Sequence, residues 1–316
     1  MIQQEALSYL YLYSWQLNEA ELCQLEMRAL FGKDTTSNIL LSSVKVEPSR
    51  SPFIRSRLDV LYEANEVAEI AHFAEGLALG NTTFKVVCLN SLDLGEEKKI
   101  PQTERHQVER DIALTMQGEP DLKNPDVVFG VVFHQNRWYF GHYVEGEAIW
   151  LKHQQKPEMY STALSTRVAR AIANIAIPNP EGVRAIDPCC GIGTVLVEAL
   201  SMGMNIVGSD INPLVVKGSR TNIAHFGLHG DVSKSDIAQI TESYDVAIID
   251  MPYNLFTHIS VDEQFTIIKE VRRIAKKVVL VTIATIDEMV HAAGFNIVDR
   301  CIVKKGTFER QVLVCE

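Results

Sequence analysis

The sequence predicts an α/β protein in which a doubly wound, mostly parallel sheet follows a mixed α+β region. From Val183 onward, short apolar segments alternate with helical segments, which is the order of a doubly wound sheet. The last two apolar segments, 294–305 and 308–316, predict an antiparallel hairpin with a tight turn at Lys305-Gly306. Before residue 150, strands and helices follow one another without a regular crossover, as in small α+β modules.

The expected elements follow from the local pattern of apolar residues and of residues that break regular structure. In the C-terminal half we expect strands at 183–187, 205–210, 230–234, 245–250 and 277–282, and helices starting at Thr194 and spanning 212–226 and 262–276. In the N-terminal half we expect a strand beginning near residue 9, a helix over 18–31 stopped by Gly32, and a helix over 103–117, with strands at 83–90, 126–136 and 137–144. The polar segment 152–160 is the best linker candidate.

Composition limits the class of protein and its partners. A chain of 316 residues with 47% hydrophobic residues is long enough for two or three domains. It has no apolar run of about 18 residues and no basic start of a signal peptide, so we expect a soluble, cytoplasmic protein without a membrane partner. The six cysteines lack zinc-ligand spacing, which predicts reduced thiols and no metal site. The net charge of −10 disfavours nucleic-acid binding unless folding gathers a basic patch.

The stretch "DPCCGIG", residues 187–193, lies on an expected strand-to-helix turn. Gly191 and Gly193 let the backbone approach a ligand at a helix N-terminus. A dinucleotide-binding fingerprint requires a third glycine at position 196, where Leu196 stands. Asp187 would repel a pyrophosphate but can accept hydrogen bonds from an ammonium group, which suits S-adenosylmethionine.

Two further carboxylates follow expected strands. Asp210 comes 23 residues after Asp187, close to the spacing at which an acidic residue meets a ribose diol, although "SDINP" is also a helix N-cap signature with Pro213 in the first turn. Asp231 can accept the amino group of an adenine, and it can equally be a turn residue.

The stretch "IIDMPYN", residues 248–254, ends the fourth expected strand. It places a carboxylate, an exposed carbonyl and an aromatic ring at the edge where α/β sheets bind ligands. Asp250 and the Met251 carbonyl can accept the two hydrogens of an exocyclic base amine, and Tyr253 can stack on a flipped base. These are the groups needed to methylate a base amine.

"DPCCGIG" and "DMPY", in this order and about 60 residues apart, resemble motifs I and IV of the amino-methyltransferases. Through the segment from "FKVVCLN" to "WYFG" (84–141), the N-terminal half resembles a THUMP RNA-binding domain preceded by a ferredoxin-like module. Within it, "LKNPDV" followed by an apolar strand and "WYFG" is similar to the end of a THUMP domain. "MYSTALSTRVARAIANIA" (159–176) is similar to the helix that leads into the catalytic domain. Together these features resemble the THUMP-containing tRNA guanosine N2-methyltransferases over nearly the whole chain.

The resemblance implies a ferredoxin-like module over 1–60, a THUMP domain over 61–151, a linker and lead-in helix over 152–182, and a Rossmann-like class I methyltransferase domain over 183–316. The resemblance also implies S-adenosylmethionine as the cofactor and RNA as the partner, with tRNA favoured. The implied cofactor-binding residues are Asp187, Cys190, Gly191, Gly193, Thr194, Asp210 with Ile211 after it, and Asp231. Those implied for the base amine are Asp250, Met251, Pro252 and Tyr253.

Three residues depart from the family pattern. Met251 replaces the first proline of Asp-Pro-Pro-Tyr, Asn254 stands where glycine is frequent, and Ser165 replaces a proline in the lead-in helix. Two alternatives stay open: a methyltransferase for another amine (rRNA guanosine, a cytosine amine, adenine N6 or protein glutamine), and an RNA-binding relative without catalysis. A dinucleotide oxidoreductase is disfavoured by Leu196. The need for an activator subunit and the oligomeric state are not encoded in any pattern that we recognise.

Overall fold

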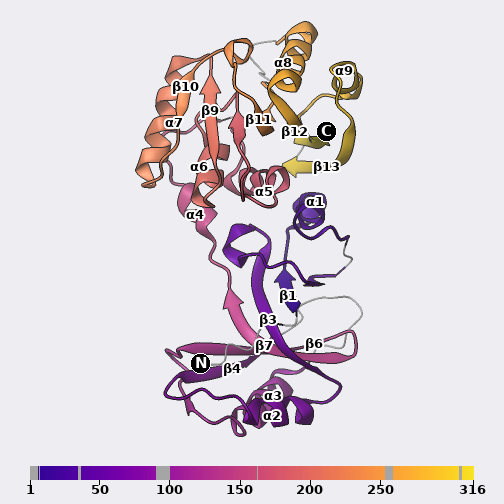
Figure 1. Cartoon of the computed structure of the whole chain (residues 1–316), viewed down its shortest axis with the longest axis vertical. Helices are drawn as coiled ribbons and strands as arrows, with labels where there is room; N and C mark the ends of the chain where they lie inside the picture. Colours follow the sequence, from indigo (N-terminus) through magenta and orange to yellow (C-terminus); the bar gives the residue numbers. More distant parts are fainter. Residues whose placement is uncertain are drawn as a thin grey trace. The chain divides into compact units, whose positions relative to one another are not determined.

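The computed structural model describes residues 6, 8–34, 37–89, 100–161, 163–252, 259–305 and 308–316. Contacts divide the chain into two compact units (Figure 1). The first comprises Met1–Ser14, Thr35–Ser49 and Phe53–Glu147, and the second comprises Trp15–Asp34, Arg50–Pro52 and Ala148–Glu316. Within the described part of the chain, no helix combines the length and the apolar character needed to cross a membrane.

The first unit is built on a seven-stranded mixed sheet with the order β2-β1-β3-β7-β6-β4-β5. Its strands are β1 (Ser8–Tyr13), β2 (Ile39–Ser42), β3 (Ile54–Ala64), β4 (Thr83–Cys88), β5 (Glu119–Pro120), β6 (Val127–His134) and β7 (Arg137–Glu145). β6 and β7 form a hairpin whose two-residue turn, Gln135 and Asn136, has positive φ angles of 47° and 62°. Such a turn matches the twist of the flanking strands.

Two helices, α2 (Val67–Glu75) and α3 (Gln102–Ala113), pack together in this unit against an apolar cluster that includes Phe84, Phe129 and Phe140. The phenylalanines alternate with residues of the other sheet face, as expected for strands covered by helices on one side. The short η2 helix (Pro48–Arg50) follows β2 and spans the boundary between the two units. The strands and the helix α3 confirm the α+β pattern read from the sequence.

The second unit contains a seven-stranded sheet with the order β10-β9-β8-β11-β12-β14-β13. Its strands are β8 (Ala185–Asp187), β9 (Ile206–Asp210), β10 (Val232–Lys234), β11 (Tyr244–Asp250), β12 (Ala275–Thr282), β13 (Ile297–Lys305) and β14 (Phe308–Cys315). Neighbouring strands from β10 to β12 are parallel, and β14 runs antiparallel between β12 and β13. The predicted doubly wound sheet closed by an antiparallel hairpin is therefore confirmed, and Gly306 of the predicted turn lies outside the described residues.

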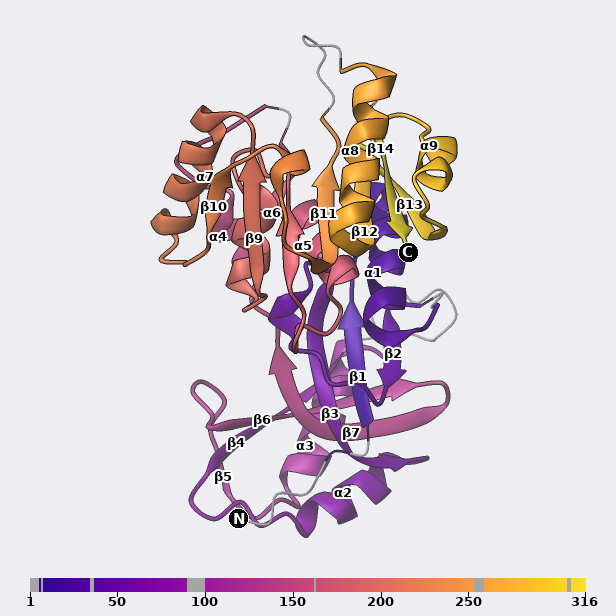
Figure 2. The ribbon, with the colours of Figure 1, turned by 45° about the horizontal axis from the view of Figure 1, so that its top comes forward.

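Helices cover both faces of this sheet (Figure 2). On one face lie α5 (Thr166–Ala176), α6 (Thr194–Ser201) and α7 (Pro213–His225), with α4 (Ile149–His153) beside α5. On the other face lie η3 (Ile237–Gln239), α8 (Val261–Ile274) and α9 (Asp287–Ala292). Apolar side chains of these helices form one cluster with Ala247 and Ile249 of β11 and with Met251, which follows β11. Side chains alternate along a strand, so Ile248 and Asp250 point to the α5 side.

The N-terminal segment of the second unit contains η1 (Leu17–Glu19) and α1 (Ala20–Phe31), and Gly32 ends α1 with φ +65°. The helix α1 packs on α5 and β13. Arg28 donates two 2.8 Å hydrogen bonds to Asp299, and the Ile302 amide of β13 donates to Glu21 at 2.8 Å. The sheet edge formed by β13 is therefore covered by residues that lie more than 250 positions away in sequence.

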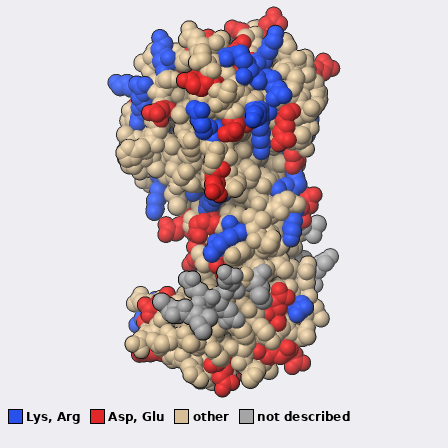
Figure 3. Space-filling view, viewed as in Figure 1, with Lys and Arg blue, Asp and Glu red and all other residues tan. Residues whose placement is uncertain are grey.

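Charged side chains are mixed on the surface. On the face shown in Figure 3, Lys and Arg gather on the part formed by the second unit, where Asp and Glu lie between them. Cations of this unit also serve the fold. Arg273 of α8, for example, donates to Glu270 at 2.7 Å and to the Ile240 carbonyl at 2.6 Å. The basic run at the end of α8 therefore includes a residue that fastens this helix to the segment around η3.

Candidate cofactor-binding and active site

The loop between β8 and α6, residues 188–193, has the geometry of a ligand-binding turn. Gly191 and Gly193 have φ angles of +51° and +76°, which side chains other than glycine rarely adopt. The Gly193 amide donates to the Cys190 carbonyl at 2.8 Å and the Cys190 amide to the Ser209 carbonyl at 3.0 Å. Thr194 begins α6, so the loop ends at a helix N-terminus whose first amides lack intrahelical partners.

Leu196 stands where a dinucleotide-binding loop has glycine. The strand β9, which packs against α6, has a glycine that makes room for the Leu196 side chain. A Cβ atom on Gly208 of β9 would lie 2.4 Å from the Leu196 side chain and 3.2 Å from the Cys190 sulfur. The close approach of helix and strand is therefore achieved by a glycine on the strand and not by one on the helix.

Asp210 ends β9 and joins two loops. Its carboxylate accepts a 3.0 Å hydrogen bond from the Gly191 amide and a 2.9 Å bond from the Asn212 amide. The N-cap of α7 is Asn212, whose side chain accepts from the Leu214 amide at 2.9 Å. Capping therefore does not account for Asp210, and its carboxylate lies on the same cavity as the loop after β8.

The structure does not bring Asp231 to this site. Asp231 precedes β10, and its carbonyl accepts from the Gly208 amide at 2.8 Å. Because β9 and β10 are parallel, Asp231 lies toward the amino end of the sheet, whereas the cavity lies at the carboxyl ends. Asp236, which follows β10, lines the cavity instead and accepts from the Ala238 amide at 2.9 Å.

Asp250 ends β11 and also lines the cavity. The next residue, Met251, is buried in the core. Met251 is 3% exposed, and its amide donates to the Val281 carbonyl of β12 at 2.8 Å. Pro252 is exposed and lines the cavity. Tyr253 and Asn254 lie outside the described residues. Met251 therefore extends the pairing of β11 by one bond that a proline at this position could not donate.

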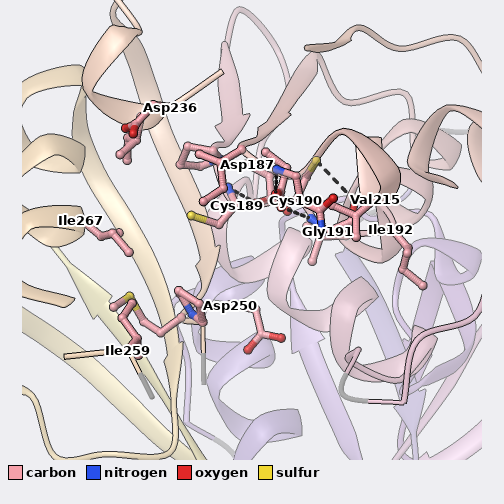
Figure 4. A pocket seen from close by; sticks show the side chains of 18 of the residues that line it. Asp187, Cys189, Cys190, Gly191, Ile192, Val215, Asp236, Asp250, Ile259 and Ile267 are labelled. Atoms are coloured by element: carbon pink, nitrogen blue, oxygen red, sulfur yellow. Dashed lines mark hydrogen bonds between the residues drawn. The ribbon is translucent and has the colours of Figure 1, made fainter. Parts of the chain in front are cut away.

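The cavity has a volume of about 730 Å³, within the range of small-ligand sites. Figure 4 shows Asp187, Asp236 and Asp250 on different sides of it. Burial, together with the nearby charges of Asp210 and Asp250, raises the pKa of Asp187 well above its usual range. Several carboxyl groups thus line one cavity, an arrangement that favours a cationic ligand and disfavours a pyrophosphate.

Two buried polar atoms in the cavity lining lack a hydrogen-bond partner within the described residues: Thr194 Oγ1 and Asp250 Oδ1. Buried polar atoms normally have partners, so each points to a group that a ligand supplies. A hydroxyl at a helix N-terminus suits a ligand carboxylate, and the neighbouring Asp187 suits an ammonium group. This donor set fits S-adenosylmethionine, which carries an amino-acid end and a cationic sulfonium.

Sequence reasoning missed the cavity walls contributed by the lead-in segment and by α8, which include Tyr160, Leu164, Glu263 and Ile267. Ser165, the residue that replaces a family proline, is the N-cap of α5 and accepts from the Val168 amide at 3.4 Å. Among the residues described, no cluster of three or more His, Cys, Asp or Glu side chains could hold a metal ion.

Buried charged side chains connect the helix α6 to α5 and α4. Glu198, fully buried, accepts a 2.8 Å hydrogen bond from Arg170 of α5, and its other oxygen lies 2.8 Å from His153 Nδ1 of α4. Arg170 also donates to the Arg50 carbonyl at 3.0 Å. These contacts fix the position of α6. They also fix the C-terminal end of the loop 188–193, which leads directly into α6.

Comparison with known proteins adds a domain assignment. Residues 154–293 match the family described as UPF0020, RMKL-like, methyltransferase domain. This match, the strand order and the cavity at the carboxyl ends of β8, β9 and β11 agree, so the second unit has the Rossmann-like fold of a methyltransferase that uses S-adenosylmethionine.

Among curated relatives, a tRNA (guanine(10)-N2)-dimethyltransferase of Methanothermobacter thermautotrophicus is 35% identical over 32% of this chain and 31% of its own length. The protein of the same description from Pyrococcus abyssi is 27% identical over 45% of each chain. The match thus spans less than half the length of these curated relatives. The crystal structure of TrmN from Thermus thermophilus aligns over 98% of this chain and 99% of its own, with 18% identity and a TM-score of 0.49.

Proposed function

We propose that this protein transfers a methyl group from S-adenosylmethionine to the exocyclic N2 amine of a guanosine in RNA, with tRNA as the substrate class. The observation that carries the proposal is Asp250 Oδ1, which is buried, has no hydrogen-bond partner among the described residues, and lies in the same cavity as the glycine loop and Asp210. The proteins from Methanothermobacter and Pyrococcus, whose names specify guanine N2 of tRNA, support the choice of base and atom.

Four parts of the chain would hold the cofactor. Asp187 would bind the ammonium group, and the loop at Gly191 and Gly193, with Thr194, would bind the carboxylate. Asp210 would accept from the ribose hydroxyls, with Ile211 at the cavity wall beside it. Asp236 would accept from the adenine amino group. When bound, S-adenosylmethionine supplies an electrophilic methyl group on sulfur, which needs no metal.

Asp250 would act on the amine. The lone pair of an exocyclic amine is delocalised into the base, so the nitrogen becomes nucleophilic only when its hydrogens are bound by acceptors. Asp250 Oδ1 and the Met251 carbonyl are acceptors at one edge of the sheet, and the base must leave its helix to reach them. Burial raises the pKa of Asp250 to about 7, against the opposing charge of Arg310, so this carboxyl can also take up the proton that the nitrogen releases.

The first unit would bind the RNA, as the THUMP resemblance implies. With a net charge of −10 for the chain, binding must rest on local groups of cations. Among the cations of this unit, Arg110, Lys123 and Arg137 are exposed, so they are available for phosphate contact. Arg137 lies 3.8 Å from Glu63. Lys156 of the second unit is only 8% exposed and is a poor phosphate contact.

The test separates cofactor binding from transfer. Asp250→Ala and Asp250→Asn variants are titrated with S-adenosylhomocysteine by calorimetry and assayed with labelled cofactor and unmodified tRNA. Affinity is expected to stay within a few-fold of the native protein, while transfer falls by roughly 10²–10⁴-fold, the range for loss of a proton acceptor. Normal turnover by Asp250→Ala would refute the role of Asp250.

A further inference from the structure

Arg310 lies on the same face of the second sheet as Asp250. Asp250 of β11 pairs with Val281 of β12, and Val281 pairs with Val312 of β14. Paired residues on neighbouring strands point to one face, and residues two apart on a strand do likewise. Arg310, two residues before Val312, therefore points to the face of Asp250.

Both side chains are also at the same edge of the sheet. β12 ends at Thr282, whose partner is Gln311, so Arg310 extends past the end of β12. With strands about 4.8 Å apart, the Cα atoms of Arg310 and Asp250 are separated by two strand spacings, roughly 10 Å, plus an offset of two residues. An extended arginine side chain is long enough to cover much of that distance, and the Arg310 charge acts on the Asp250 carboxyl.

The guanidinium is mostly removed from water. Arg310 is 9% exposed, and its charge opposes the effect of burial on the pKa of Asp250. A cation in a partly buried site acts on a neighbouring carboxyl more strongly than one in water, because the surroundings screen it less. An arginine stays protonated throughout the accessible pH range.

We propose that Arg310 is a positioning residue that keeps Asp250 in its carboxylate form for the transfer reaction. The inference rests on the proposed function, because only an ionised Asp250 can accept an N–H and then a proton. The β13–β14 hairpin would then contribute to the chemistry as well as closing the sheet.

Other charges near Asp250 act in the opposite direction. Asp187, the last residue of β8, and Cys189, in the loop after it, interact with Asp250 electrostatically. A negative charge on either disfavours the Asp250 carboxylate. The remaining titratable groups of the cavity lining are Tyr160, Cys190, Asp210, Asp236, Glu263 and Glu270. None of these described residues is a permanent cation, so Arg310 has no substitute among them.

The experiment measures the pH dependence of single-turnover methyl transfer for the native protein, Arg310→Gln, Arg310→Lys and a control, Arg300→Gln. Arg300 lies on the partner strand β13, and its ion pair with Asp287 has an N–O distance of 2.6 Å. Its substitution removes one positive charge from the same hairpin. We expect the acid limb of the Arg310→Gln profile to move up by about one pH unit, with transfer recovering in alkaline buffer. Arg310→Lys and Arg300→Gln should keep the native midpoint.

A second readout does not depend on turnover. The carboxyl carbons of ¹³C-labelled aspartate are titrated by NMR, with the Asp250 signal assigned from Asp250→Asn. A raised pKa of Asp250 in Arg310→Gln, with no change in Arg300→Gln, is the expected result. An unchanged Asp250 pKa, or a transfer rate lowered by one factor at every pH, would overturn the role of Arg310. If the native protein transfers no methyl group to RNA, the proposed function fails, and the NMR titration still decides whether Arg310 controls Asp250.

Discussion

The Gly191 amide donates a 3.0 Å hydrogen bond to the carboxylate of Asp210, so the turn after β8 is tied to the end of β9. The Asp210 carboxylate thereby fixes the loop after β8 and also lines the cavity. A cofactor that bridges the two strand ends would find both walls already in place. This preorganisation lowers the cost of ordering the loop on binding.

The affinity for the cofactor should depend on the carboxylates of the cavity and not on Asp231. Asp210→Ala loses the loop contact and a charged acceptor, so we expect S-adenosylhomocysteine to bind about 10- to 100-fold more weakly, as for loss of a hydrogen bond to a charged group. Asp236→Ala should weaken binding by about 10-fold. Asp231→Ala is the matched control. Calorimetry in which Asp231→Ala weakens binding as much as Asp236→Ala would contradict the assignment.

The two glycines of the loop should respond differently to alanine. A Cβ atom on Gly193 would lie 2.2 Å from Ser219 Oγ, whereas one on Gly191 would meet nothing within 4 Å. Both positions have positive φ, which costs about 1 kcal/mol for alanine. Urea unfolding should therefore show a loss near 1 kcal/mol for Gly191→Ala and at least twice that for Gly193→Ala. Equal losses would mean that the contact with Ser219 relaxes without cost.

A proline at position 251, as in the Asp-Pro-Pro-Tyr motif that this stretch resembles, should destabilise this protein. Met251→Pro removes the hydrogen bond to Val281 and most of a buried side chain, so we expect the free energy of unfolding to fall by about 2–4 kcal/mol. Met251→Leu keeps the amide and a similar volume and should cost less than about 1.5 kcal/mol. Thermal unfolding of the two variants checks this. A Met251→Pro protein as stable as the native one would show that the bond to β12 contributes little.

The contribution of Glu26 to stability should fall as pH rises toward neutrality. Burial raises the pKa of Glu26 from 4.5 to about 7, although Ser51 and Asn174 donate to it at 2.5 and 2.7 Å. The folded state then binds a proton that the unfolded state has lost, so this contribution is fully present below about pH 4.5 and is lost through pH 7, by on the order of 3 kcal/mol. Glu26→Gln should flatten this part of the curve.

The control for that titration is Glu288→Gln. Glu288 is exposed and lies on α9 of the same unit. Denaturant unfolding measured at several pH values between 4.5 and 7 should give the native slope for Glu288→Gln and a smaller slope for Glu26→Gln. Identical slopes for the two variants would mean that Glu26 is already ionised in the folded protein at pH 4.5.

Much of the second unit could be predicted because its strands are short apolar runs that end at chemically distinct residues. Asp187, Asp210 and Asp250 each end a parallel strand, so their meeting at one edge follows from the topology alone. Asp231 lies away from the cavity for a local reason. β10 begins at Val232, after Asp231. The aspartate that follows β10, in "KSDIAQ", is Asp236, which also caps η3.

The partners of buried charges could not be predicted. Glutamate is normally an exposed residue, yet Glu26 and Glu198 are fully buried. Their partners, among them Arg170 and Asn174, lie on segments that pack only in the folded chain. Likewise, the covering of β13 by α1 joins the first tenth of the sequence to the last, a contact with no local signal.

The most direct test of the central claim is transfer of a labelled methyl group from S-adenosylmethionine to bulk unmodified tRNA, followed by mass spectrometry of the digested nucleosides. The account predicts labelled N2-methylguanosine, lost with Asp250→Ala and retained with Asp231→Ala. Label in a different nucleoside, or no label in any nucleoside although S-adenosylmethionine binds, would contradict it.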